Sequence, residues 1–125
     1  MAEEEKLKIK KEYIDPTTVI YLSGQLDAHT APDLEDYIRE VLDKGSKNLL
    51  FNFKDLEYIS SAGLGVFMAF IEEVRNNNGD IKFSEMQENV YSVFDLLGFP
   101  MLFDIVEKDE KALEKFQSGD IFKNE

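Results

Sequence analysis

The feature that most constrains the fold of this chain is the alternation of strand-like and helix-like segments along it. Two segments near the start alternate apolar and polar residues, and Asp15-Pro16 between them favours a turn. Helical periodicity then follows each apolar, strand-like run. The predicted strands are 7–14, 17–23, 48–53, 80–84 and 102–106, and the predicted helices are 30–45, 60–75, 89–97 and 110–116. This order predicts an α/β protein with an N-terminal hairpin, a mixed, mostly parallel sheet and about four helices.

The length and the charge of the chain limit what it binds. Its 125 residues suit a single domain, predicted to span 1–125 with an ordered core at about 6–117 and mobile ends at 1–5 and 118–125. The 26 acidic residues outnumber the 14 basic ones and give a formal net charge of −12. Because nucleic-acid binding draws most of its affinity from Lys and Arg contacts to phosphates, DNA and RNA are not expected partners.

The sequence also argues against an exported or membrane protein. Residues 1–10 are charged and lack the apolar stretch of a signal peptide. The longest mostly apolar run, 62–71, is shorter than the roughly 18 residues that a membrane-spanning helix needs. Cysteine is absent, which excludes disulfides and thiolate chemistry and fits a reducing compartment. We therefore expect a cytoplasmic protein without a membrane partner.

Catalysis and metal binding are not expected from the residues available. His29 is the only histidine, and without a cysteine there is no evident set of nucleophile, base and orienting group around it. The acidic residues run consecutively, as in Glu72-Glu73, and lack the spacing of an EF-hand or another metal site. The sequence therefore predicts a protein that is not an enzyme and that holds neither a metal nor a cofactor.

Two loops at predicted strand ends carry the residues of interest, since function in open α/β sheets gathers where strands end and helices begin. The first loop is 23–27, and the second is 55–65, which enters the second helix. Ser60 or Ser61 can cap that helix by accepting a backbone N–H bond. A phosphate on such a hydroxyl would be stabilised by the helix N-terminus, so phosphorylation would leave the helix intact and act on a partner. A helix cap without any modification is the competing interpretation.

The residues of these two loops resemble the STAS domain of bacterial anti-sigma factor antagonists. The first loop contains Gly24-Gln25-Leu26-Asp27, and the second contains Asp55-Leu56 and then Ile59-Ser60-Ser61-Ala62-Gly63-Leu64-Gly65. The resemblance extends to the order of elements over nearly the whole chain. It implies a STAS-like fold and a protein-interaction switch. The unmodified protein would bind an anti-sigma factor of the serine-kinase type, and phosphorylation would release it.

The family's loop-to-helix segment implies which serine is modified. It reads D-S-S-G-L or D-S-T-G-L, and the first hydroxyl residue after the acid is phosphorylated. Matching its G-L to Gly63-Leu64 places Ser61 at that position, with Ser60 as the alternative acceptor. Ser60 stands where the family has its acid, and Ala62 where it has the second hydroxyl residue. The resemblance thus implies phosphorylation of Ser61 by the kinase, with ATP as the kinase's substrate, and a phosphoserine phosphatase as a further partner.

Further partner-binding residues are expected around Ser61. Asp27 matches the acid of the family's G-x-L-D element and would contact either Ser61 or the partner, or else bond to local amides at the strand end. In the second helix, Val66 and Phe70 add apolar surface beside the main apolar stripe. They either pack inside the fold or form a partly exposed patch that docks a partner. The predicted partner-binding residues are Asp27, Ser60, Ala62, Gly63, Val66 and Phe70.

Two other functions remain open at this point. A STAS-like domain could hold a nucleotide or another small anion at the N-terminus of the second helix. It could also serve, without phosphorylation, as a scaffold in another signalling complex.

Overall fold

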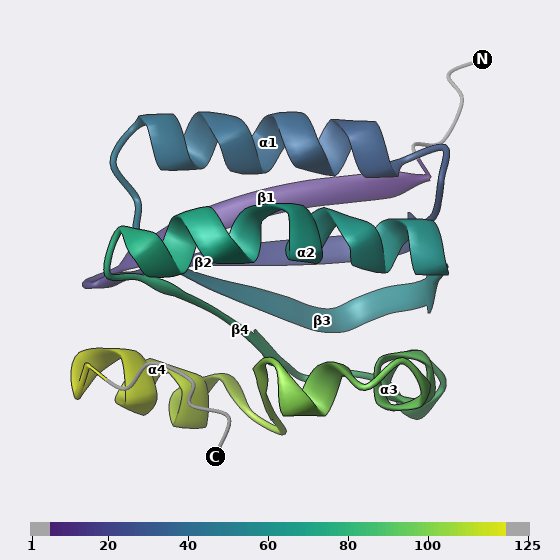
Figure 1. Ribbon diagram of the computed structural model, residues 1–125. Helices are drawn as coiled ribbons and strands as arrows, with labels where there is room; N and C mark the ends of the chain where they lie inside the picture. Colours follow the sequence, from purple (N-terminus) through teal and green to yellow (C-terminus); the bar gives the residue numbers. More distant parts are fainter. Residues whose placement is uncertain (1–5, 120–125) are drawn as a thin grey trace.

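The computed structural model describes residues 6–119, so the predicted mobile ends lie outside the described residues except for Ser118 and Gly119. The described chain forms one five-stranded sheet with four α-helices and one short 3₁₀-helix (Figure 1). In chain order the elements are β1 (Leu7–Ile14), β2 (Thr17–Leu26), α1 (Ala31–Asp43), β3 (Asn48–Ile59), α2 (Ser61–Asn76), β4 (Asp80–Ser84), α3 (Glu88–Leu96), the 3₁₀-helix η1 (Phe99–Met101), β5 (Asp104–Val106) and α4 (Asp109–Gln117).

The sheet has the strand order β1-β2-β3-β4-β5. Strands β1 and β2 form an antiparallel hairpin, whereas β2, β3, β4 and β5 are parallel to one another. Each parallel connection contains a helix, because a crossover between parallel strands needs a long connection. The predicted α/β class, the N-terminal hairpin and the four helices are therefore confirmed.

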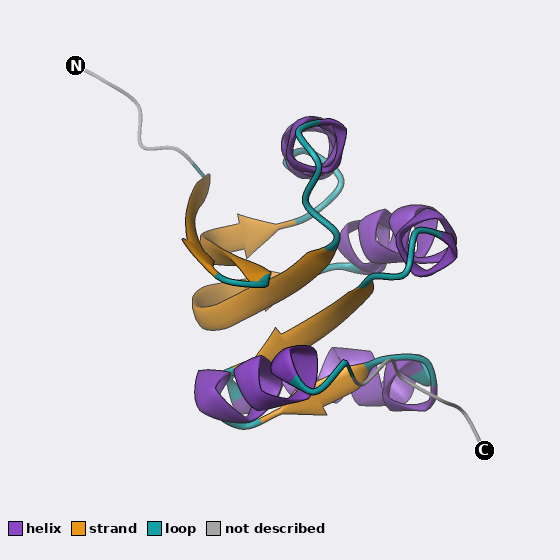
Figure 2. Cartoon of the chain, turned by 90° about the vertical axis from the view of Figure 1, so that its left-hand side faces the viewer, coloured by secondary structure: helices purple, strands orange, loops and turns teal. Residues whose placement is uncertain are grey.

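Helices cover both faces of the sheet (Figure 2). In β2 and β3, the side chains of Ile20 and Phe51 belong to the main core, which also contains residues of α1, α2 and α3. Successive strand residues point to opposite faces, so their neighbours Val19 and Leu50 pack on the other side, against Phe116 of α4. Helices α1 and α2 lie side by side over the first face (Figure 1). Burial on both faces explains why the start of β3 is a nearly continuous apolar run.

Phenylalanine rings dominate the main core. Phe83 of β4 contacts five other rings, at centroid distances of 4.9 to 6.0 Å. Three of these pairs, with Phe67, Phe94 and Phe103, are edge-to-face, and each such pair adds about 0.5–1.5 kcal/mol beyond the burial of its area. One of the partners is Phe67 of α2, which is fully buried. The ring cluster therefore fixes α2 on the sheet, and with it the start of that helix. Its members are Phe51, Phe53, Phe67, Phe83, Phe94, Phe99 and Phe103.

Strand β3 departs most from the sequence prediction, since it continues to Ile59 instead of ending at Phe53. Its pairing with β2 shifts register at two places near Gly24, where β3 contributes one residue more than β2. These bulges interrupt the strict alternation by which a strand is recognised in a sequence. Strand β2 likewise extends to Leu26 instead of ending at Ser23.

The connection between α3 and β5 also differs from the prediction. Residues 99–101 form the short 3₁₀-helix η1, for which the sequence predicts no helix, and β5 begins at Asp104 instead of Leu102. Gly98 ends α3 in the left-handed conformation with a φ of 78°, and Pro100 fits the first turn of the short helix.

A network of charges is buried between β4, β5 and α4. Lys82 has no exposed surface, and its Nζ donates hydrogen bonds to Asp80 at 2.9 Å and to Asp104 at 2.7 Å. The same ammonium lies 5.0 Å from the ring centroid of Phe116. Arg75, near the end of α2, donates to Asp80 at 2.9 Å. Because an unpaired buried charge is strongly destabilising, this network depends on all of its partners.

Candidate functional site

The two loops singled out in the sequence meet at one edge of the sheet. The last residues of β2 and β3, Leu26 and Ile59, are paired in the parallel register. The backbone N–H of Ser60 donates to the carbonyl oxygen of Leu26 at 3.0 Å. Since neighbouring strands lie about 4.8 Å apart, the residues that follow, Asp27 and Ser60, leave the sheet side by side. The structure therefore brings together the first loop and the start of α2.

Ser60 caps α2. Its backbone is extended, with φ −102° and ψ 169°, and its Oγ accepts a hydrogen bond from the backbone N–H of Gly63 at 3.2 Å. The carbonyl oxygen of Ser60 also accepts from the backbone N–H of Leu64 at 3.1 Å. This is the geometry of an N-cap serine, which contributes about 1 kcal/mol. The hydroxyl of Ser60 is thus engaged in holding the helix.

Ser61, in contrast, is the first residue of α2 and is exposed. Within the described residues, its hydroxyl makes no hydrogen bond, and the backbone N–H groups of Ser61 and Ala62 have no partner. Such N–H groups are left over at the start of every α-helix, and together with the helix dipole they favour a negative charge there. An accessible hydroxyl therefore lies beside unpaired donors at the positive end of α2.

Gly63 lets the start of α2 approach the sheet. A Cβ atom at this buried position would lie 2.8 Å from the carbonyl oxygen of Leu26 and 3.2 Å from a side-chain carbon of Ile59. Any side chain would push the helix start away from the strand ends. Gly63, predicted as a partner-binding residue, is therefore placed in the packing beneath the site instead of on its surface.

Asp27 is held by local hydrogen bonds. Its Oδ1 accepts from the backbone N–H groups of His29 at 2.9 Å and Thr30 at 3.1 Å, and its Oδ2 lies 3.3 Å from Nζ of Lys6. Desolvation raises the pKa of Asp27, but these hydrogen bonds and the lysine outweigh it and hold the pKa below its usual value. No hydrogen bond joins Asp27 to Ser61 among the described residues. Of the two roles considered for Asp27, its contacts fit that of a strand-end carboxylate that accepts hydrogen bonds from local backbone amides.

The exposed face of α2 differs from the predicted one. Of the two alternatives for Val66 and Phe70, packing inside the fold is the one observed, since both are buried, with 1% and 7% of their surface exposed. Phe70 lies under the guanidinium of Arg39 of α1, at 5.3 Å from its ring centroid. The partly exposed patch is not formed, because α1 packs against α2, a contact that helical periodicity cannot reveal. The exposed residues of the helix up to residue 70 are Ser61, Ala62, Gly65, Met68 and Ala69.

This exposed face of α2 is uncharged and nearly smooth. Met68 is its only large side chain and is 45% exposed, while nothing lies within 4 Å of a Cβ placed on Gly65. Charged residues make up 32% of the chain, so a face of two helical turns without one is a contrast to the rest of the surface. It leads directly away from Ser61.

Two residues near the site were missed in the sequence. Tyr58, at the end of β3, is 49% exposed, and its position between buried Leu56 and Ile59 would have been a signal had the strand been extended beyond Phe53. Lys6 precedes β1 and reaches Asp27 only through the sheet pairing, a contact with no local sequence signal.

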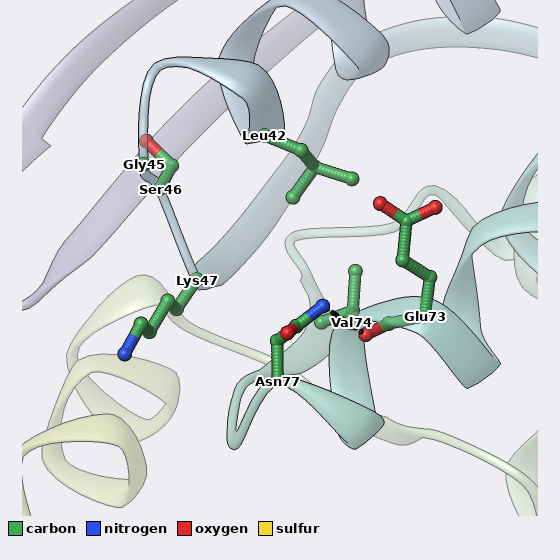
Figure 3. A pocket seen from close by; sticks show the side chains of 7 residues that line it. All are labelled: Leu42, Gly45, Ser46, Lys47, Glu73, Val74 and Asn77. Atoms are coloured by element: carbon green, nitrogen blue, oxygen red, sulfur yellow. Dashed lines mark hydrogen bonds between the residues drawn. The ribbon is translucent and has the colours of Figure 1, made fainter.

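A cavity of about 250 Å³ lies between the C-terminal ends of α1 and α2, at the other end of α2 from Ser61 (Figure 3). Its carboxylate, Glu73, is bound by Arg39 through two hydrogen bonds of 2.8 and 2.7 Å, while Lys47 points away from it. Among residues 6–119, no group of three or more His, Asp or Glu side chains is placed to hold a metal ion.

Among residues 6–119, no helix has the length and the apolar character needed to span a membrane.

The fold and the loop geometry define a class of protein: a small α/β domain with a serine at the start of the helix that follows its third strand. The family model of the STAS domain matches residues 8–112. The chain therefore belongs to the STAS domain family, as the loop residues implied.

Relatives and solved structures agree with this assignment. The chain is 29% identical over 113 residues to BtrV of Bordetella bronchiseptica, covering 90% of this chain and 97% of that protein. It is 28% identical over 95 residues to the anti-sigma-B factor antagonist of Bacillus subtilis, covering 76% and 86%. The unphosphorylated anti-sigma factor antagonist SpoIIAA of Bacillus superposes with a TM-score of 0.77 at 22% identity, covering 89% of this chain and 97% of that one. Its phosphorylated form gives 0.68 at 22% identity, with 87% and 99% covered.

Proposed function

We propose that this protein is an anti-sigma factor antagonist, a switch that binds an anti-sigma factor of the serine-kinase type and is released when Ser61 is phosphorylated. The single observation that carries the proposal is the exposed, unbonded hydroxyl of Ser61 at the start of α2. A kinase can reach this oxygen, and the uncharged face of α2 beside it gives the kinase a surface to bind. The switch would act in the cytoplasm without catalysis of its own.

The geometry explains why Ser61 is favoured over Ser60. The Oγ of Ser60 is occupied as the acceptor in the helix cap, so modifying it would disrupt the start of α2. A phosphate on Ser61 would instead face the unpaired N–H groups of Ser61 and Ala62 and the positive end of the helix dipole. The folded state would tolerate it.

The expected release follows from charge. Phosphorylation adds about −1.5 to −2 charges at the edge of the uncharged α2 face. Forcing these charges into an interface without a cationic partner costs a few kcal/mol, and each ~1.4 kcal/mol weakens binding tenfold. A phosphoserine phosphatase would then restore the binding form.

The relatives support this proposal by their names. The relative from Bacillus subtilis is an anti-sigma-B factor antagonist, and SpoIIAA is an anti-sigma factor antagonist that is known in unphosphorylated and phosphorylated forms. In this chain the same role would fall to Ser61, which follows the third strand at the start of α2.

The test uses the cognate anti-sigma factor kinase and ATP. Incubation should place one phosphate on Ser61, mapped by mass spectrometry, and binding measured by calorimetry should fall by at least about 100-fold. Ser61→Asp should bind as weakly as the phosphorylated protein. Ser61→Ala should bind well and accept no phosphate.

Ser60→Ala is the matched control, because it removes the neighbouring hydroxyl and leaves the acceptor in place. It should still be phosphorylated, although its helix is less stable. Phosphate found only on residues other than Ser61, or full binding by Ser61→Asp, would contradict the proposal.

The unpaired N–H groups of Ser61 and Ala62 also suit a second function, the binding of a nucleotide or another small anion. In that case calorimetry with ATP alone should show saturable binding that Ser61→Asp abolishes. A STAS scaffold that works without phosphorylation would bind its partner equally well before and after treatment with the kinase.

A further inference from the structure

A groove lies at the C-terminal ends of β4 and β5, beside α3. Its volume is about 420 Å³, and its lining residues are Met86, Glu88, Tyr91, Ile105, Val106 and Glu107. Four of these side chains are apolar or aromatic, and Tyr91 is 39% exposed. In parallel sheets this edge is where ligands bind, although fold alone does not say which.

The stretch of sequence that forms the groove is acidic. The chain has no Lys, Arg or His between Lys82 and Lys108, a stretch that contains five acidic residues. Two of the five are used inside the fold, since Asp104 binds Lys82 at 2.7 Å and Glu85 lies 3.8 Å from Lys108.

The two acidic residues that line the groove are different. Glu88 and Glu107 are exposed, and neither forms an ion pair within the described part of the chain. Their carboxylates therefore stand free at the two sides of an apolar surface, one at the start of α3 and one just after β5.

We propose that this groove binds a segment of a partner protein that presents an Arg or Lys side chain among apolar residues. The long apolar stem of such a side chain would cover Tyr91 and Ile105, and its cationic end would lie between Glu88 and Glu107. Arg is the better fit, since its planar group can donate to two carboxylates and stack on an aromatic ring.

Charge complementarity decides against other occupants. A second copy of this chain carries a net charge of −12 and would bring further acidic residues, and an anionic membrane surface would be repelled as well. A small cationic molecule would be poorly enclosed, because the walls of the groove remain partly exposed.

This binding site is separate from the proposed phosphorylation switch. It is built from β4, α3 and β5, whereas the switch is built from β2, β3 and α2. Neither depends on the other, so one can be absent while the other is present.

The test uses two synthetic peptides and the full-length, ¹⁵N-labelled protein. The first is an acetylated, amidated amphipathic peptide of 12 residues made of leucine and arginine, and the second has glutamate in place of every arginine. The arginine peptide should bind saturably and shift the amide signals of Met86, Tyr91 and Val106 first. The glutamate peptide should not bind.

The double variant Glu88→Gln/Glu107→Gln should weaken binding of the arginine peptide at least tenfold. Its control, Glu35→Gln/Glu114→Gln, removes the same number of charges from exposed positions on α1 and α4 and should bind as the unmodified protein does. Thermal melting shows that each variant is folded.

Three results would overturn the inference. The first is an equal loss of binding in both double variants, which would show that the peptide responds only to net charge. The second is signal shifts centred on other residues, or no binding at all. The third is self-association of the free protein that protects the groove amides, which would assign the groove to a second copy.

Discussion

Two polar regions of this molecule differ in whether their polar groups have hydrogen-bond partners. At the buried cluster between β4, β5 and α4, Lys82 is paired with both Asp80 and Asp104, and Arg75 adds a further bond to Asp80. At the start of α2, the Ser61 hydroxyl and two backbone N–H groups have no partner within the described residues. The first region is closed and complete, and the second is open.

The difference separates stability from interaction. A buried charge without partners is strongly destabilising, so the Lys82 cluster must satisfy every group internally. An exposed helix start can leave its donors to water and exchange that water for a phosphate or for a partner. Changes in the closed region should therefore alter folding, and changes in the open region should alter binding.

The largest effect on stability is expected for Lys82→Met. The variant keeps the apolar stem but removes the cation that Asp80 and Asp104 share, so unfolding by urea should show a loss of about 3 kcal/mol or more. Lys111→Met, at an exposed position on α4 without an ion pair in the described chain, should change stability by less than about 0.5 kcal/mol. Equal effects in the two variants would refute the assignment of a structural role.

Gly63→Ala tests the close contact beneath the open region. The added methyl group would lie 2.8 Å from the carbonyl oxygen of Leu26, so we expect a loss of about 1–3 kcal/mol in urea unfolding. Binding of the proposed anti-sigma factor partner should weaken too, since the helix start must move. An unchanged free energy of unfolding would show that the ends of β2 and β3 move to accommodate the methyl group without loss of stability.

Ser60→Ala tests the cap. Removing the acceptor for the N–H of Gly63 should lower stability by about 1 kcal/mol. Ser61→Ala, which removes a hydroxyl without a partner, should lower it by much less. The measurement is thermal melting. A larger loss of stability in Ser61→Ala than in Ser60→Ala would show that Ser60 is not the helix cap.

Gly65→Ala should have the opposite sign. Nothing lies within 4 Å of the new methyl group, and glycine inside a helix is less stable than alanine by roughly 0.5–1 kcal/mol, so the variant should be more stable. If the α2 face binds the anti-sigma factor closely, the same methyl group should weaken binding measured by calorimetry. A gain in both stability and binding would contradict the docking surface.

The smallest effect concerns pH. The pKa of Asp27 is lowered in the folded protein, so its charged form stabilises the fold above the ordinary carboxylate pKa. This contribution is lost as the pH falls through the lowered pKa, below about pH 4. The unfolding free energy of the unmodified protein should therefore fall more steeply in this range than that of Asp27→Asn. Parallel curves would show that the local hydrogen bonds of Asp27 do not depend on its charge.

The sequence by itself determined the class of the fold and where the candidate site was to be sought. Hydrophobic periodicity identifies the order of strands and helices because each element buries one side, and the parallel crossovers follow from that order. The residues from Ser60 to Leu64 mark the helix start because capping is a local interaction. These features need no knowledge of distant contacts.

Only the tertiary structure decided which residues of α2 face solvent. Val66 and Phe70 are buried, Phe70 beneath Arg39 of α1, whereas Met68 is exposed, because helix packing joins segments that are far apart in the sequence. The full length of β3 could not be predicted for the same reason. Its bulges are defined by the pairing with β2, which local periodicity does not show. Local periodicity shows which residues are apolar, but the tertiary fold determines which neighbour buries each of them.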